Sequence, residues 1–193
     1  MIDYLNNKVI IKLSENKIIQ KKDVEIYRYG LDLLSATIVK IVGLGIIALL
    51  LGVVKETFLF IICFSSLRIQ AGGIHANTLL KCFIMTVALT LGSIYLVGLL
   101  TKDLYVYFQV LSILLSIILV FRYAPIESSN KPLTEEEKVL YKSRSMATVV
   151  IWGIIILMIN IIYGSNTNLG NIASIGLLTE SLTLVPLRLK LNK

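Results

Sequence analysis

The stretch LDLLSATIVKIVGLGIIALLLGVV, from Leu31 to Val54, decides the class of fold. A helix that crosses the hydrocarbon core of a bilayer needs about 20 mostly apolar residues, and this run is long enough. The whole chain agrees, because 56% of its 193 residues are hydrophobic, only 16% are charged, and the mean hydropathy is +0.82. This balance excludes an ordinary soluble domain and predicts an all-α polytopic membrane protein.

Further apolar runs follow toward the C-terminus. Residues 57–67, after the Lys55-Glu56 tip, form a run that is short for a crossing, so it thins the bilayer, is completed by its flanks or re-enters. The next run ends at Leu100, before a turn at 101–103. The remaining runs cover 104–121, 146–163 and 172 to about 187, where Pro186 bends or ends the helix. We therefore expect about six apolar segments.

Two hydrophilic regions frame these runs. Within residues 1–25, apolar side chains recur every three or four positions, which indicates an amphipathic helix at the membrane surface or packed against the membrane bundle. Residues 122–145 form a hydrophilic loop, in which Thr134 followed by three glutamates predicts a capping box at a helix N-terminus. We expect an N-terminal helix in 1–25 and one transmembrane domain over 26–193.

The distribution of charge predicts the orientation. The net charge is +7, and most cations lie in the N-terminal region, around 68–81, in the 122–145 loop and in the C-terminal tail. By the positive-inside rule, both termini and the 68–82 region face the cytosol of a multi-pass cell-membrane protein, with six crossings if the short run counts. No secretory signal pattern precedes the first run, so we expect the N-terminus to be retained.

Three charged residues lie within or beside apolar runs: Asp32, Lys40 and Glu180. Charge is costly there and needs a partner or a wet cavity. Lys40 and Glu180 form a candidate pair across helices. The alternatives are an ion pair that fixes helix packing, side chains that snorkel to the interface, or a path through a small transporter.

The stretch SSLRIQAGGIHANTLLKC, residues 65–82, carries the candidate chemistry. His75 is the single histidine of the chain, and Cys82 follows it by seven residues. An imidazole that takes the proton of a thiol is the minimum equipment for nucleophilic attack on a carbonyl. The other cysteine, Cys63, lies inside an apolar run and is interpreted as a packed apolar residue. A lone His or Cys at an apolar boundary is, however, more often structural.

Helix geometry limits how His75 and Cys82 can meet. An unbroken helix starting near Ala76 would place Cys82 about two turns in, and seven residues separate two side chains by about 10 Å along the axis, too far for proton transfer. The backbone must therefore bend, and Gly72-Gly73 gives the approach to His75 conformational freedom. A β-branched residue in place of Gly73 is expected to disable the chemistry without removing the protein from the membrane.

Other residues can support the pair. Lys81 and Arg68 add positive potential that favours a thiolate, and Arg68 can also hold a substrate carboxylate or brace a loop carbonyl. A third group often orients such an imidazole; Gln70, Asn77 and Glu127 are candidates, and the sequence selects none of them. One His and one available Cys are too few for a zinc site, and we expect no cofactor.

Two motifs give a family resemblance. The pattern R-x3-G-G-x-H-x6-C from Arg68 to Cys82, and RYAPIESSNKPLTEEEK from Arg122 to Lys138, resemble the AgrB-like membrane cysteine endopeptidases of Gram-positive quorum sensing. The length, the charged N-terminal helix and the order of apolar runs match too, so that nearly the whole chain is covered. The chain departs from the family at Glu127, where Asp is frequent.

The resemblance implies that Cys82 is the nucleophile and His75 its base, with Arg68 and Gly73 in support. It implies cleavage of the C-terminal part of a small precursor peptide, after which a side chain of the peptide attacks the thioester and closes a thiolactone or lactone. Such precursors have an amphipathic N-terminus and an acidic C-terminal segment, which the cytosolic cations would attract.

The alternative from another class is a small membrane transporter or binding protein with a structural His/Cys segment, but no inverted repeat is visible. A membrane scaffold for a sensor partner is a third interpretation. A homodimer is compatible with so small a bundle, and we expect no nucleic-acid partner. The ring size and the sequence of the precursor stay open.

Overall fold

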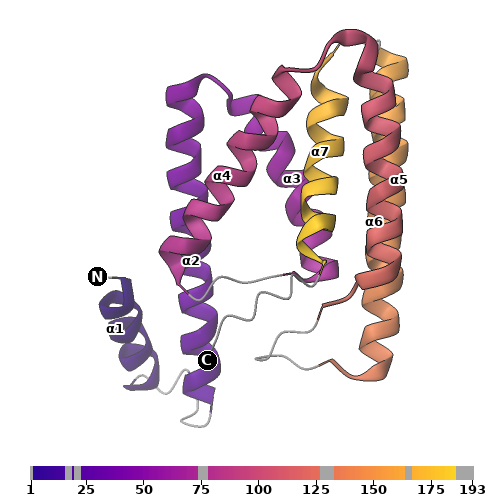
Figure 1. The fold of residues 1–193 in the computed structure, drawn as a ribbon. Helices are drawn as coiled ribbons and strands as arrows, with labels where there is room; N and C mark the ends of the chain where they lie inside the picture. The colour runs from indigo at the N-terminus through magenta and orange to yellow at the C-terminus, as the bar shows by residue number, and fades with distance from the viewer. Residues whose placement is uncertain are drawn as a thin grey trace, which may run out of the picture. The chain divides into compact units, whose positions relative to one another are not determined.

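The computed structural model is built of helices (Figure 1). It describes residues 2–15, 19, 23–73, 78–126, 133–163 and 167–185, and none of these forms a strand. The all-α prediction is therefore confirmed. The helices are α1 (Ile2–Glu15), α2 (Val24–Leu51), α3 (Val54–Ala71), α4 (Leu79–Gly98), the short 3-10 helix η2 (Lys102–Leu104), α5 (Tyr105–Tyr123), α6 (Glu135–Tyr163) and α7 (Leu169–Thr183).

Among the described residues, four helical segments are long and apolar enough to cross a membrane. They are Val24–Leu51, Leu80–Gly98, Lys102–Tyr123 and Glu135–Ile162. A chain with several such segments is a polytopic membrane protein, as the sequence predicts. Helices α3 and α7 are not among them, so the count of six crossings stays a prediction.

The described chain divides into two compact units, residues 1–52 and 53–193. In the first unit, α1 packs against α2 through the buried side chain of Asn6. The Asn6 amide donates to the Asp32 carboxylate at 2.7 Å and accepts from the Ser35 hydroxyl at 2.9 Å. Asp32 thus has a partner at the edge of its apolar run, as the cost of burying charge requires. Of the two interpretations of the N-terminal helix, packing against a membrane helix is supported.

Helix α2 ends earlier than its apolar run. Gly52 adopts a left-handed conformation with φ 70°, and its N–H caps the carbonyls of Ala48 and Leu49. A glycine in this conformation is a common helix terminator. The expected helix through Val54 therefore stops at Leu51, and the next helix begins with Val54 itself.

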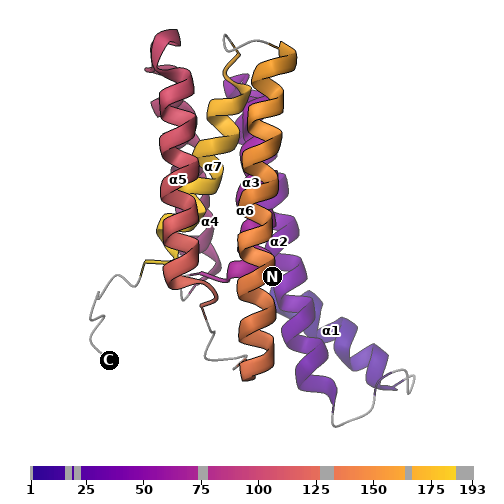
Figure 2. The same ribbon diagram turned by 90° about the vertical axis from the view of Figure 1, so that its right-hand side faces the viewer.

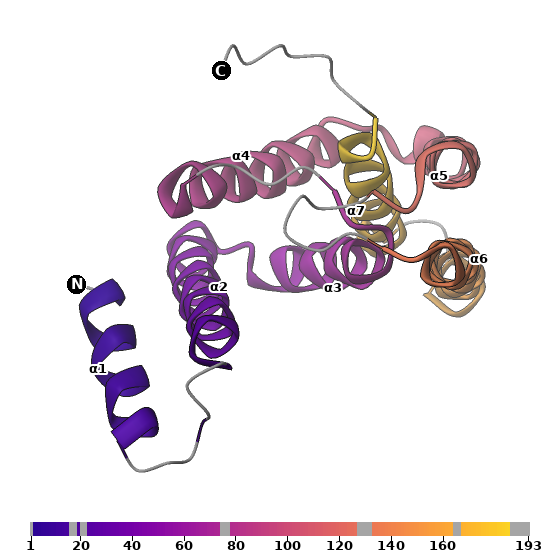
Figure 3. The ribbon, with the colours of Figure 1, turned by 90° about the horizontal axis from the view of Figure 1, so that it is seen from below.

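The second unit places α7 at its centre, between α3, α4, α5 and α6 (Figures 2 and 3). Most of its residues are buried, although several are polar. Asn171, Ser174, Glu180 and Ser181 are fully buried. Lipid cannot pair with such groups, whereas neighbouring helices can. The four surrounding helices thus shield the polar side chains of α7 from the bilayer.

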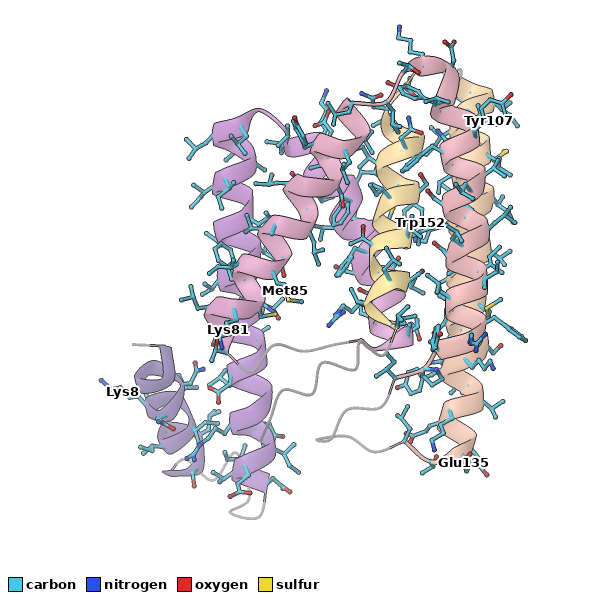
Figure 4. All side chains as sticks on the ribbon, viewed as in Figure 1. Lys8, Lys81, Met85, Tyr107, Glu135 and Trp152 are labelled. Atoms are coloured by element: carbon cyan, nitrogen blue, oxygen red, sulfur yellow. The ribbon has the colours of Figure 1, made fainter. Side chains whose placement is uncertain are left out.

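Small side chains allow α7 to approach α3 closely. A methyl group added at Gly176 would lie 3.1 Å from the Phe60 carbonyl oxygen and 3.2 Å from Cβ of Cys63. Cys63 is fully buried in the apolar core, which confirms its interpretation as a packed residue. On the other side of α3, the Trp152 indole on α6 donates to the Ser66 hydroxyl at 2.7 Å (Figure 4).

Carboxamides join three helices near the N-terminal end of α7. Gln109 of α5 donates to Asn171 at 2.9 Å and accepts from Asn160 of α6. Gly170 makes room for this contact, because a methyl group there would lie 2.7 Å from the Gln109 amide nitrogen. Interhelical hydrogen bonds of this kind help to hold membrane helices together.

The short apolar run at 57–67 is part of a longer helix. Residues 57–67 lie inside α3, one continuous helix of 18 residues. At 1.5 Å per residue this helix is about 27 Å long, close to the thickness of a hydrocarbon core.

The capping box before α6 is confirmed too. The Thr134 hydroxyl accepts from the Glu137 N–H at 3.3 Å, and the Glu137 carboxylate accepts from the Thr134 N–H at 2.9 Å.

Candidate active site

Cys82 lies in the first turn of α4, where the chain enters an apolar helix. Its thiol is unbridged and only partly buried, in contrast to the enclosed Cys63. Its N–H donates to the Thr78 carbonyl at 3.0 Å, and its own carbonyl accepts from Thr86 at 2.8 Å. The backbone around Cys82 is thus held in helical geometry while part of the side chain remains accessible.

The helix begins later than expected from the sequence. Thr78 is the N-cap of α4, with extended backbone at φ −136° and ψ 149°, and its hydroxyl accepts from the Lys81 N–H at 3.3 Å. A helix starting near Ala76 is therefore wrong, and Cys82 lies one turn in rather than two. Because the backbone at Thr78 is extended, a single unbroken helix cannot run from position 75 to Cys82. The bend that would bring His75 to Cys82 stays a prediction, since residues 74–77 lie outside the described residues.

Gly72 and Gly73 form the turn at the other end of the segment. Their φ angles are 77° and 144°, values that residues with a side chain rarely adopt. Neighbours also exclude a side chain, because a methyl group at Gly72 would lie 2.5 Å from the Ile126 carbonyl oxygen. At Gly73 a methyl group would meet the Arg68 guanidinium and the Thr183 hydroxyl. Both glycines are required by conformation and by space.

Arg68 is bound by the C-terminal end of α7. One guanidinium nitrogen, Nη1, lies 3.1 Å and 3.3 Å from the two carboxylate oxygens of Glu180 and donates to the Thr183 hydroxyl at 3.2 Å. Glu180 is fully buried, whereas the Arg68 side chain is 23% exposed. Arg68 therefore braces α3 against α7 with a carboxylate of the chain itself. The sequence offers Lys40 as a candidate partner of Glu180, whereas in the structure Glu180 pairs with Arg68.

The two sequence motifs meet at the end of α3. The Ile126 N–H donates to the Ala71 carbonyl at 2.9 Å, and the Ile126 carbonyl packs on Gly72. Ala71 and Gly72 thus contact the segment that follows α5, although more than 50 positions of sequence separate them. The contact joins the first motif to the second at one end of the unit.

The other predicted site residues lie away from the double-glycine turn or outside the described residues. In Figures 1 and 3 the N-terminal end of α4 lies apart from the C-terminal ends of α3 and α7. Lys81 is exposed on this part of α4 (Figure 4). His75, Asn77 and Glu127 lie outside the described residues. Gln70 is described, and its side-chain oxygen is buried without a hydrogen-bond partner in the described part of the chain.

Glu180 and Thr183 are the residues that the sequence analysis did not assign to the site. The signal that could have found them is their level along the helix bundle. In a chain whose helices alternate in direction, Arg68 and Glu180 both stand near the C-terminal ends of helices that run the same way, and so at one level of the bundle. A rule that pairs charges by depth would have selected Arg68.

Fold and site together define a polytopic all-α membrane protein with a cysteine at the entrance of one membrane helix and a buried ion pair beside a double-glycine turn. The family model "AgrB: Accessory gene regulator B" matches residues 6–184. The chain therefore belongs to the accessory gene regulator B family and has its general role. No solved structure matches it.

Curated relatives agree with the family. The chain is 27% identical over 169 residues to a putative AgrB-like protein of Clostridium perfringens strain SM101, covering 84% of this chain and 79% of the relative. It is 26% identical over 180 residues to putative AgrB-like protein 2 of Clostridium perfringens strain 13, covering 88% and 82%. A putative AgrB-like protein of Clostridium acetobutylicum is 24% identical over 155 residues, covering 79% and 72%.

Proposed function

We propose that the chain is a membrane-embedded cysteine endopeptidase that cleaves a small quorum-sensing precursor peptide and allows its cyclisation. The observation that carries the proposal is the partly accessible thiol of Cys82 in the first turn of α4, close after His75 in a member of the AgrB family. The site faces the cytosol in this proposal.

The reaction has two steps. His75 takes the proton of the Cys82 thiol, the sulfur attacks a peptide carbonyl, and His75 returns the proton to the departing amine. A thioester to the N-terminal part of the precursor remains. A thiol or hydroxyl of the same peptide then attacks the thioester, closes a thiolactone or lactone and releases the Cys82 thiol. Water must be kept from the thioester, and a position at the membrane boundary favours this.

The competing transporter has less support. Its path would use charged residues in apolar segments, but Asp32 binds Asn6 and Glu180 binds Arg68. Both carboxylates are engaged in contacts between helices. Such contacts stabilise the packing of helices.

Co-expression with the candidate precursor encoded beside the gene tests the proposal. Cys82→Ala and His75→Ala should each reduce cleavage by about 100-fold or more, because each removes an essential part of the chemistry. Cys63→Ser is the matched control and should cleave like the wild type, since Cys63 lies in the core. A hydroxylamine-sensitive peptide adduct on Cys82 would identify the thioester. Unchanged cleavage in both the Cys82 and His75 variants would disprove the proposed endopeptidase activity.

A further inference from the structure

We propose that Glu180 is a positioning residue for the reaction, acting through Arg68 on the turn that leads to His75. The proposal rests on the function proposed above. Glu180 is the charged residue of α7, the most enclosed helix of the described unit, and its side chain is fully buried. An ionisable group so deep in a membrane protein is costly, so a role beyond helix packing is the first hypothesis.

The contacts run from α7 to the double-glycine turn. Both Glu180 oxygens lie within 3.3 Å of Arg68 Nη1. The same nitrogen donates to the hydroxyl of Thr183, which in turn donates to the Glu180 carbonyl at 2.8 Å. One atom of Arg68 is therefore fixed by three oxygens of α7, and arginine is suited to such multidentate contacts.

Arg68 Nη1 is also the atom against which Gly73 packs. A methyl group at Gly73 would approach it more closely than any non-bonded contact allows, and Gly73 itself is buried. The position of the guanidinium therefore decides where Gly73 can lie. Gly73 precedes His75 by two residues, so the carboxylate fixes the last described position before the proposed base.

Packing alone does not require this carboxylate. Helix α7 already packs on α3 through Gly176, and on α4 through the hydroxyls of Ser93 and Thr179, which lie 3.2 Å apart. The polar Ser181 next to Glu180 is equally buried, but its hydroxyl donates within α7 to the Leu177 carbonyl. Ser181→Ala is thus a matched control that removes a buried polar group from the same turn.

The test measures how fast iodoacetamide alkylates Cys82 across a range of pH, using the full-length protein in lipid nanodiscs. An ordinary thiol ionises near about pH 8.5, and an imidazole partner keeps the thiolate available at lower pH. Glu180→Gln keeps the shape and removes the charge. It should slow alkylation at pH 7 at least about ten-fold and shift the pH profile toward that of His75→Ala, whereas Ser181→Ala should match the wild type.

A double variant covers the case in which Glu180→Gln does not fold. Arg68→Met with Glu180→Met leaves no unpaired buried charge, and such replacements are often neutral for stability. It should fold and show the same shifted profile. A wild-type profile in either variant overturns the role of Glu180. If His75→Ala itself keeps the wild-type profile, the proposed chemistry fails as well, so the two failures are distinguishable.

Discussion

At the scale of single residues, Gly73 joins the fold to the chemistry. Its φ of 144° and its contact with Arg68 leave no room for a side chain. Valine at this position should reduce precursor cleavage at least about ten-fold while the protein stays in the membrane, because the strained backbone costs about 1–3 kcal/mol locally. Cleavage and membrane content are measured together. Gly92→Val, where nothing lies within 4 Å, is the control. Wild-type cleavage by the Gly73 variant would contradict the assignment.

The neighbouring residues in sequence were enough to distinguish the two cysteines. Cys63 is surrounded by apolar residues, and Cys82 follows a polar segment. The partner of Glu180 could not be found in this way. A buried carboxylate selects a cation by distance in three dimensions, and the sequence alone pointed to Lys40 instead of Arg68. The contact of Ile126 with Ala71 and Gly72 was equally hidden, since it joins backbone groups that carry no sequence signal.

At the scale of elements, the N-cap of α4 should influence the reactivity of Cys82. Thr78→Ala removes the hydroxyl that accepts from Lys81, and the loss of such a cap costs about 1 kcal/mol. The first turn should fray, which hydrogen exchange of the Lys81 and Cys82 amides would detect, and cleavage should fall about five-fold, the equilibrium factor for that energy. Thr78→Ser should restore both. Equal exchange in Thr78→Ala and the wild type would refute the capping role.

Element boundaries were predictable where a local signal exists. The capping box at Thr134 gave the start of α6 because its hydrogen bonds are made within one turn. The start of α4 was misplaced, since Ala76 is a good helix former and Thr78 as cap is a weak signal. The enclosure of α7 could not be predicted from its apolar run. It depends on four other helices that surround the polar side chains of α7.

At the scale of the whole molecule, apolar composition was enough for the all-α membrane class, but it leaves the number of crossings open. Helix α3 combines an apolar run with charged ends, and α7 has only 15 residues and carries several polar side chains. Among the described residues, neither helix is counted as both long and apolar enough to cross a membrane. Their membrane position depends on enclosure by neighbours, which is a property of the assembled unit.

Accessibility of single cysteines decides whether α3 crosses the membrane, which the count of six crossings requires. Figures 1 and 2 place the N-terminal end of α3, with Lys55, at the same end of the second unit as η2, with Lys102, and the N-terminal end of α6, with Glu136, at the opposite end. In a Cys63→Ser/Cys82→Ser background, Lys55→Cys and Lys102→Cys should react with an impermeant maleimide on intact cells. Glu136→Cys should react only after permeabilisation, because the cations of that end favour the cytosol. If α3 does not cross, Lys55→Cys and Lys102→Cys will be labelled from opposite sides.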